Sequence, residues 1–240
     1  MKNISIYNLG ISALLIEAGN RRILIDAFNN LITPVNVLPK DIIVFTHCDD
    51  DHFCPERLPD LRGTDIIIIG PPTIVKPILL LKKANIEQIE VLYSGEQYAP
   101  ATICIDSMNI SCLRTKHFNH WDPLHISYVI EVSGKKIYIT GDSIFTDEQK
   151  NIIGTVDAVV CNLVDEGFLR GSEEAKVANQ HILSYLLKVR ALMKNAKIIG
   201  VHLLEASFTV DAENLNNLVK LLGFDESIII PICPQQKVVI

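Results

Sequence analysis

The chain has 240 residues, 48% of them hydrophobic and 21% charged, which fits one large soluble domain and excludes a disordered chain. Its formal net charge of −6 argues against nucleic-acid binding, because phosphate recognition needs clustered Lys and Arg. No apolar stretch approaches the roughly 18 residues of a membrane span, and the first ten residues lack the apolar run of a signal peptide. We therefore expect a cytoplasmic protein without membrane contacts.

Strands and short helices alternate through the first half of the chain. Residues 1–26 are typical of a β-meander, in which Gly19-Asn20 is a turn. Asp41–Phe45 is a continuous apolar strand, so both of its faces should be buried, and it leads directly into Thr46 and His47. The pattern then predicts a short helix over 55–61, a buried strand over 65–70 and a helix over 73–83.

The second half repeats this order of a β-meander followed by strands and helices. The expected elements are strands over 89–93, 102–105, 110–113, 126–132, 136–140 and 157–161, a helix over 173–194, a strand over 197–201, a helix over 211–222 and a last strand over 228–230. We interpret the two halves as similar units packed into a single domain that covers residues 1–240.

Histidine and aspartate residues stand at the C-terminal ends of four expected strands. They are the segment His47–His52, His117, Asp142 and His202. Ligands collect at such edges because loops turn inward there while the strands hold them in place. Imidazole nitrogen and carboxylate oxygen suit zinc, iron and manganese alike. The sequence therefore predicts a site for divalent metal ions at this edge.

The densest group is the metal loop, residues 46–53, which holds His47, Asp49, Asp51 and His52. Alternate side chains of an extended segment point the same way, so the first three converge, whereas His52 requires a bend. The alternative is a solvated acidic loop. A histidine at either end of the run, directly after an apolar strand, argues against that alternative.

The metal loop resembles the H-x-H-x-D-H signature of the metallo-β-lactamase superfamily. The resemblance extends over most of the chain, through Leu24-Ile25-Asp26, the metal loop, His117, Gly141-Asp142-Ser143 and His202 in matching order. It implies an α+β fold, the four-layer αβ/βα sandwich, with the site at one edge of the two sheets. It also implies that the chain is a metal-dependent hydrolase.

Carried onto this chain position by position, the resemblance implies two metal ions. One is held by His47, Asp49 and His117, the other by Asp51, His52 and His202, and Asp142 bridges the two. The resemblance places Asp26 behind these ligands, where it orients one of them.

Asp49 departs from the family signature, which usually has His at this position. A carboxylate is a harder ligand than imidazole and adds negative charge, so we expect a shift from zinc towards manganese or iron. Sequences with His-x-Asp-x-Asp-His resemble the branch that contains ascorbate-6-phosphate lactonase-like proteins.

Three histidines fall in the segment TKHFNHWDPLH, and one of them is needed as a ligand. We favour His117, the first after the strand. His120 and His125 are then expected to line the substrate pocket and to steady a developing oxyanion. The alternative is that both are surface histidines of the loop.

These residues predict metal-assisted hydrolysis of a small molecule. Two divalent ions, Zn, Mn or Fe, lower the pKa of a shared water, and Asp51 both binds metal and accepts the proton of that water. We expect a small ester, lactone or phosphate-containing metabolite as the substrate, and leave a homo-oligomer open.

Two alternatives to hydrolysis remain at this point. One is a di-iron redox enzyme, although such relatives usually carry a fused flavin domain, for which 240 residues leave no room. The other is a non-catalytic metal-binding module of the same fold, against which the full ligand set weighs.

Overall fold

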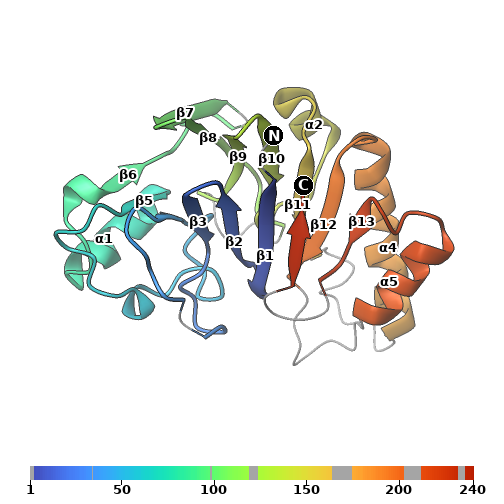
Figure 1. Ribbon diagram of the computed structural model, residues 1–240, viewed down its shortest axis with the longest axis horizontal. Helices are drawn as coiled ribbons and strands as arrows, with labels where there is room; N and C mark the ends of the chain where they lie inside the picture. Colours follow the sequence, from blue (N-terminus) through green and yellow to red (C-terminus); the bar gives the residue numbers. More distant parts are fainter. Residues whose placement is uncertain are drawn as a thin grey trace.

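The computed structural model describes residues 3–33, 35–97, 99–118, 124–163, 175–202, 212–231 and 236–240. Within these ranges the chain forms two seven-stranded mixed sheets that share one apolar core. Helix α1 (Pro72–Leu80) lies outside the first sheet, while helices α4 (Ala175–Leu192) and α5 (Ala212–Leu221) lie outside the second (Figure 1). The layers are therefore helix, sheet, sheet and helix, which confirms the predicted α+β sandwich.

The first sheet has the strand order β14-β1-β2-β3-β4-β5-β6. Its strands are β1 (Ile4–Gly10), β2 (Ala13–Ala18), β3 (Arg21–Ile25), β4 (Ile42–Val44), β5 (Ile67–Gly70), β6 (Ile89–Val91) and β14 (Lys237–Val239). Strands β1 to β3 pair antiparallel, and β3 to β6 pair parallel. All three residues of β4 are buried, as the continuous Ile and Val run predicts for a parallel strand covered on both faces.

The second sheet has the strand order β13-β12-β11-β10-β9-β8-β7. Its strands are β7 (Pro100–Ile105), β8 (Met108–Arg114), β9 (Ile126–Val132), β10 (Lys135–Ile139), β11 (Ala158–Asn162), β12 (Lys197–Val201) and β13 (Ile228–Ile229). Strands β7 to β10 pair antiparallel, and β10 to β13 pair parallel. This sheet repeats the pattern of the first, so the predicted likeness of the two halves is confirmed.

Apolar side chains fill all three spaces between the layers. The largest cluster lies between the sheets, where Ile4 and Ile16 meet Tyr128 and Ile130. A second cluster joins the outer face of the second sheet to α4 and α5, and a third joins the first sheet to α1. Each fully buried Ile or Leu contributes roughly 1.5–3 kcal/mol relative to exposure, so these clusters hold the sheet edges in fixed positions.

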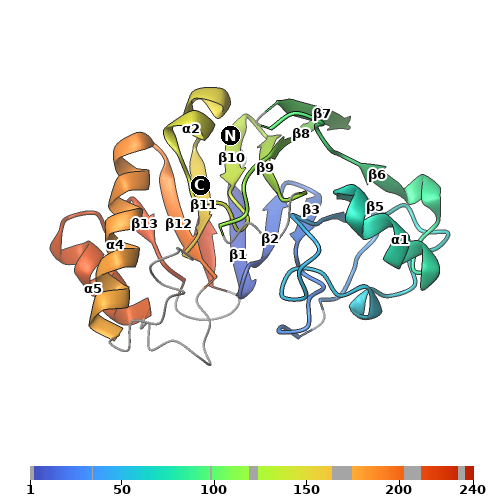
Figure 2. The ribbon, with the colours of Figure 1, turned by 180° about the vertical axis from the view of Figure 1, so that it is seen from behind.

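Four elements differ from the sequence-based prediction. Residues 228–230 are not the last strand, because β14 follows and pairs antiparallel with β1 (Figure 2). Helix α2 (Asp147–Ile153) was not predicted, although Thr146 caps it by accepting a hydrogen bond from the Gln149 amide. The helix expected over 55–61 is a single 3-10 turn at Pro55–Arg57, and a second 3-10 turn spans Ile86–Gln88.

The helices within the described ranges include none with the length and apolarity needed to cross a membrane. That the whole chain forms one domain stays a prediction.

Candidate metal centre

The predicted ligands meet where the C-terminal ends of strands from both sheets come together. Asp26 and His47 follow the parallel strands β3 and β4 of the first sheet. His117, Asp142 and His202 follow β8, β10 and β12 of the second sheet, which run in the same direction. Side chains 21 to 176 residues apart in the sequence therefore reach one place, as the strand-end pattern predicts.

The metal loop turns sharply after Asp49. The carbonyl of Asp49 accepts hydrogen bonds from the amides of His52 at 2.9 Å and Phe53 at 2.8 Å. This turn is the bend that the sequence requires to bring His52 to the same side as His47. The amide of Asn30 also donates to the carbonyl of Asp50, which fixes the loop to the segment after β3.

One group of donor atoms contains His47, His117 and Asp142. His117 Nε2 lies 3.6 Å from Asp142 Oδ2 and 3.5 Å from Asp49 Oδ2, and His47 Nε2 lies 3.6 Å from the same Asp49 oxygen. Asp49 is 37% exposed and does not belong to the compact group in which all donor atoms lie within 4.8 Å. It therefore faces the two histidines from the solvent side.

The second group contains Asp51, His52, His202 and Asp142, again with all donor atoms within 4.8 Å. His52 Nε2 lies 3.2 Å from Asp142 Oδ1, and His202 Nε2 lies 3.7 Å from that oxygen. Asp51 Oδ2 lies 3.4 Å from His202 Nε2 and 3.9 Å from His52 Nε2. The two carboxylate oxygens of Asp142 thus face different sets of histidines.

These distances suit ligands that share an ion. Two donors each about 2.1 Å from one tetrahedral ion lie roughly 3.4 Å apart, close to the 3.2–3.9 Å seen between the histidine nitrogens and the carboxylate oxygens. The Nε2 atoms of His47, His52 and His202 are also buried without a hydrogen bond to the described residues. A buried polar nitrogen left this way is costly unless something binds it, so the donor set fits divalent metal ions.

Asp26 and Thr46 determine which ring nitrogens face the centre. Asp26 Oδ2 lies 2.8 Å from His52 Nδ1 and accepts a 2.7 Å hydrogen bond from the Thr46 hydroxyl. Thr46 Oγ1 lies 2.9 Å from His47 Nδ1. Because the Thr46 proton goes to Asp26, His47 Nδ1 must be the donor, and both histidines direct Nε2 rather than Nδ1 towards the centre. This placement of Asp26 matches the role that the resemblance implied.

The charges at the centre favour a cation. Burial alone would lower the pKa of His52, but Asp142 and Asp26 outweigh it and hold that pKa well above its ordinary value. Burial alone would raise the pKa of Asp142, but His52 and His202 hold it well below its ordinary value. Asp142 therefore stays a carboxylate, and Asn162 at the end of β11 donates a hydrogen bond to its Oδ1.

The structure does not favour a substrate contact for His125. This residue is fully buried, its Nδ1 lies 2.8 Å from Thr115 Oγ1, and its Nε2 accepts a hydrogen bond from the Asp142 amide. Both ring nitrogens are therefore engaged by the protein. It is not a surface histidine either. His120 lies outside the described residues, so its expected place in the substrate pocket stays a prediction.

Sequence reasoning missed Thr115, Asn162 and the role of Thr46. Each is an uncharged residue at the end of a strand, and each contacts a partner that only the fold brings near. The one available signal was position, because all three stand at the edge where the ligands follow their strands.

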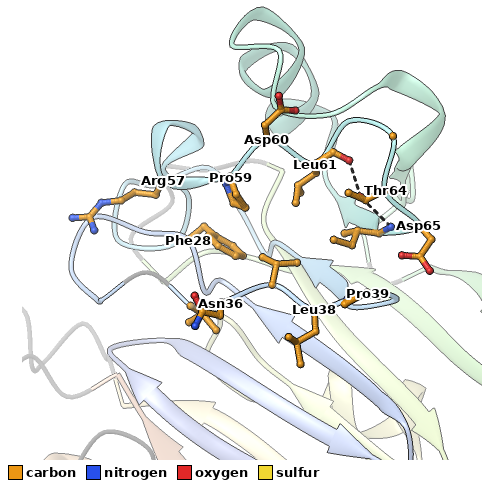
Figure 3. A pocket seen from close by; sticks show the side chains of 14 residues that line it. Phe28, Asn36, Leu38, Pro39, Arg57, Pro59, Asp60, Leu61, Thr64 and Asp65 are labelled. Carbon is orange, nitrogen blue, oxygen red and sulfur yellow. Dashed lines mark hydrogen bonds between the residues drawn. The ribbon is translucent and has the colours of Figure 1, made fainter.

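A cavity of about 860 Å³ lies apart from the metal centre, between the segment after β3 and residues 57–66 (Figure 3). Phe28, Leu38 and Leu61 line it, and Arg57 points away from its apolar centre to the carbonyls of Asn30 and Ile32. No predicted ligand lines this cavity.

Most of the chain matches a known protein family, and several solved structures share its fold. The family model described as "Beta-lactamase superfamily domain" matches residues 5–187. No curated protein sequence matches the chain. Among solved structures, a possible metal-dependent hydrolase from Veillonella parvula has 12% identity and a TM-score of 0.69, with 100% of both chains covered.

Two further structures are similar to the chain. An isothiocyanate hydrolase from gut bacteria of Delia radicum has 17% identity and a TM-score of 0.68, with 98% of each chain covered. CmlA, a diiron β-hydroxylase from Streptomyces venezuelae, has 11% identity and a TM-score of 0.67, covering 100% of this chain and 54% of that one. At these identities the likeness shows the fold alone.

Proposed function

The chain belongs to the metallo-β-lactamase superfamily of metal-dependent hydrolases, and from this premise we propose that it hydrolyses a small electrophilic metabolite at a centre of two divalent metal ions. The observation that carries the proposal is the position of Asp142. Its Oδ1 faces His52 and His202 while its Oδ2 faces His117. In this position Asp142 would contribute one oxygen to each ion.

We assign the ligands as the sequence predicts them. His47, Asp49 and His117 would hold one ion, Asp51, His52 and His202 would hold the other, and Asp142 would contribute to both. When bound, the ions act as Lewis acids towards a substrate oxygen and lower the pKa of a water molecule towards neutrality. The chain itself keeps Nε2 of His47 and His52 directed inward through Thr46 and Asp26.

Asp51 is the group best placed to accept a proton at this centre. Its carboxylate is 29% exposed, so one side meets solvent and the other meets His52 and His202. Burial raises the pKa of Asp51, but His202 and His52 outweigh it, and the pKa lies below its ordinary value. Asp51 is therefore ionised at neutral pH and can take a proton from water.

The proposed substrates are small esters, lactones, phosphate-containing metabolites and isothiocyanates. The last class is added because the isothiocyanate hydrolase shares the fold over 98% of both chains. The net charge of −6 supports a small molecule over nucleic acid. Kinship with the ascorbate-6-phosphate lactonase-like branch, a cytoplasmic location and a homo-oligomer stay predictions.

The test is a substrate screen on protein reconstituted separately with zinc, manganese and ferrous iron. We expect hydrolysis of at least one substrate class, and loss of that activity in Asp51→Asn without loss of fold. Absence of any metal-dependent hydrolysis across all classes, from protein that holds two ions per chain, would contradict the proposal.

A di-iron redox enzyme is the second candidate, supported by the shared fold of the diiron β-hydroxylase. Iron analysis of the protein as purified, with oxygen consumption under reducing conditions, separates the two. Oxygen uptake coupled to substrate, without hydrolysis, would favour the redox enzyme.

A further inference from the structure

The backbone of Asp142 is held from both sides by the segment that carries His117. The Asp142 amide donates to His125 Nε2 at 2.8 Å, and the Asp142 carbonyl accepts from the Phe118 amide at 2.8 Å. His125 has no exposed surface. Because a backbone N–H can only donate, Nε2 of His125 must carry the lone pair and its Nδ1 must carry the proton.

A chain of hydroxyls continues from the other side of the His125 ring. Nδ1 lies 2.8 Å from Thr115 Oγ1, which lies 2.8 Å from Ser127 Oγ. Ser127 in turn donates to the Thr140 carbonyl at 2.6 Å. With that proton assigned, Thr115 must donate to Ser127 and accept from His125. Every proton in the chain therefore has one direction.

Both ends of this series of hydrogen bonds reach the same short segment, residues 140–142. Ser127 holds the Thr140 carbonyl and His125 holds the Asp142 amide, so Gly141 lies between the two anchors. Gly141 has φ +54°, and a Cβ built there would lie 2.6 Å from His125 Nε2. Only glycine leaves room for the His125 ring at this distance.

We propose that His125 is a positioning residue for the metal centre and that Thr115 sets its tautomer. The proposal rests on the assignment of Asp142 as the bridging ligand. With the Nδ1–H tautomer, His125 accepts from the Asp142 amide and fixes the backbone from which the carboxylate reaches both histidine groups. With the Nε2–H tautomer, two donors face each other across 2.8 Å, and the Asp142 backbone must move.

The direct test uses two amide replacements that remove the same ring. In His125→Gln the amide oxygen can reach the place of Nε2 and keep an acceptor for Asp142. In His125→Asn the shorter amide can reach only the place of Nδ1 and keeps the contact with Thr115. The readout is the affinity of metal-free protein for zinc or manganese ions, titrated in competition with a chromophoric chelator.

We expect His125→Asn to bind the metal about 10–100-fold more weakly than the native protein, and His125→Gln to lose much less. Melting temperatures should fall in both variants, because both leave space in a buried site. Equal loss of metal affinity in the two variants would overturn the proposal, since it would show that the ring acts by packing alone.

A second pair keeps the test open if the ring variants do not fold. Thr115→Val removes the acceptor for Nδ1 with little change of shape, whereas Thr115→Ser keeps it. We expect Thr115→Val alone to weaken metal binding, by about 10-fold. Thr102→Val is the matched control, because Thr102 pairs with Ser111 on the exposed face of β7. Unchanged affinity in Thr115→Val would contradict the role of Thr115.

Nitrogen NMR of the imidazole rings tests the tautomer in native, metal-free protein. We expect His125 as the neutral Nδ1–H form and a larger share of the Nε2–H form in Thr115→Val. A native His125 in the Nε2–H form would overturn the proposal.

If the native protein binds no metal at all, the proposed function fails. If it binds two ions and the His125 variants bind like it, only this inference fails.

Discussion

Asp26 shows how one buried carboxylate organises several ligands at once. It has φ +49°, is 1% exposed, and accepts from the Thr46 amide and hydroxyl as well as from His52 Nδ1. Its two oxygens receive three donors, so neither can be replaced by an NH2 group without setting two donors against each other. The orientation of the His52 and His47 rings therefore depends on a residue that touches no ion.

Asp26→Asn should weaken metal binding by about 10–100-fold, because one oxygen that accepts hydrogen bonds becomes a donor. Titration of metal-free protein with zinc or manganese measures the change. Asp157→Asn is the control, since Asp157 accepts hydrogen bonds from Lys135 and Lys136 away from the centre. Equal metal affinity in Asp26→Asn and in the native protein would show that Asp26 does not orient the ligands.

Gly141→Ala should lower the free energy of unfolding by more than the strain of a left-handed backbone alone. An L-residue at φ +54° costs roughly 1–3 kcal/mol, and the added Cβ also meets His125 Nε2 at 2.6 Å. Gly134→Ala is the matched control, because Gly134 has φ +77° with nothing within 4 Å of its Cβ. Chemical denaturation should show the larger loss for Gly141→Ala, accompanied by lower metal content. Equal losses of stability in the two variants would show that the His125 ring can move away from the added Cβ.

Asp49 should bias the centre towards manganese or ferrous iron. His47 and His117 hold the pKa of Asp49 below its ordinary value, so it is an anionic oxygen ligand at neutral pH. In Asp49→His the relative affinity for zinc should rise, because imidazole is the softer ligand. Competition between zinc and manganese on both proteins measures this. An unchanged preference would mean that Asp49 is not a ligand.

At the scale of elements, strand β9 joins the two sheets beside the centre. The Ile126 amide donates to the Thr46 carbonyl at 3.0 Å, and the Tyr128 hydroxyl donates to the Phe45 carbonyl at 2.9 Å. Phe45 and Thr46 link β4 to the metal loop. The first sheet's ligands are thereby fixed relative to those of the second by hydrogen bonds to the Phe45 and Thr46 carbonyls and not by the ligands alone.

Tyr128→Phe should lower the free energy of unfolding by about 1–3 kcal/mol, because it leaves the buried Phe45 carbonyl without its donor. Denaturant unfolding measures the change. Tyr7→Phe is the control: the Tyr7 hydroxyl donates to Glu17 in a partly buried position, and the loss of stability should stay within about 0.5 kcal/mol. A loss in Tyr128→Phe no larger than in the control would show that this bond does not join the sheets.

The sequence predicted secondary-structure elements well where their residues are uniformly buried. It predicted them less well where pairing with another element determines whether they form. The apolar run of β4 predicted both the strand and the position of His47 just after its C-terminal end. Strand β14 has only three residues and exists because β1 offers an edge to pair with. Helix α2 carried its signals, Thr146 before it and Gly154 after it, but has only seven residues. The engagement of His125 left no local signal, since its partner Asp142 lies 17 residues away.

At the scale of the whole molecule, metal should bind to the folded chain and stabilise it. The ligands belong to both halves, and the unfolded chain cannot bring them together. An ion at 100 times its dissociation constant adds about 2.7 kcal/mol to folding. A strong chelator should therefore lower the melting temperature of metal-loaded protein, and restored metal should raise it again. Identical melts in the two states would show that the ligands from the two halves do not meet on an ion.

The most direct test of the two-ion centre is the number of metal ions bound per chain. Metal-free native protein and Asp142→Ala are dialysed to equilibrium against zinc or manganese, and the bound metal is measured by elemental analysis. The account predicts two ions per native chain and one or fewer in Asp142→Ala, because Asp142 contributes an oxygen to each group. One ion or none in the native protein, or two retained in Asp142→Ala, would contradict it.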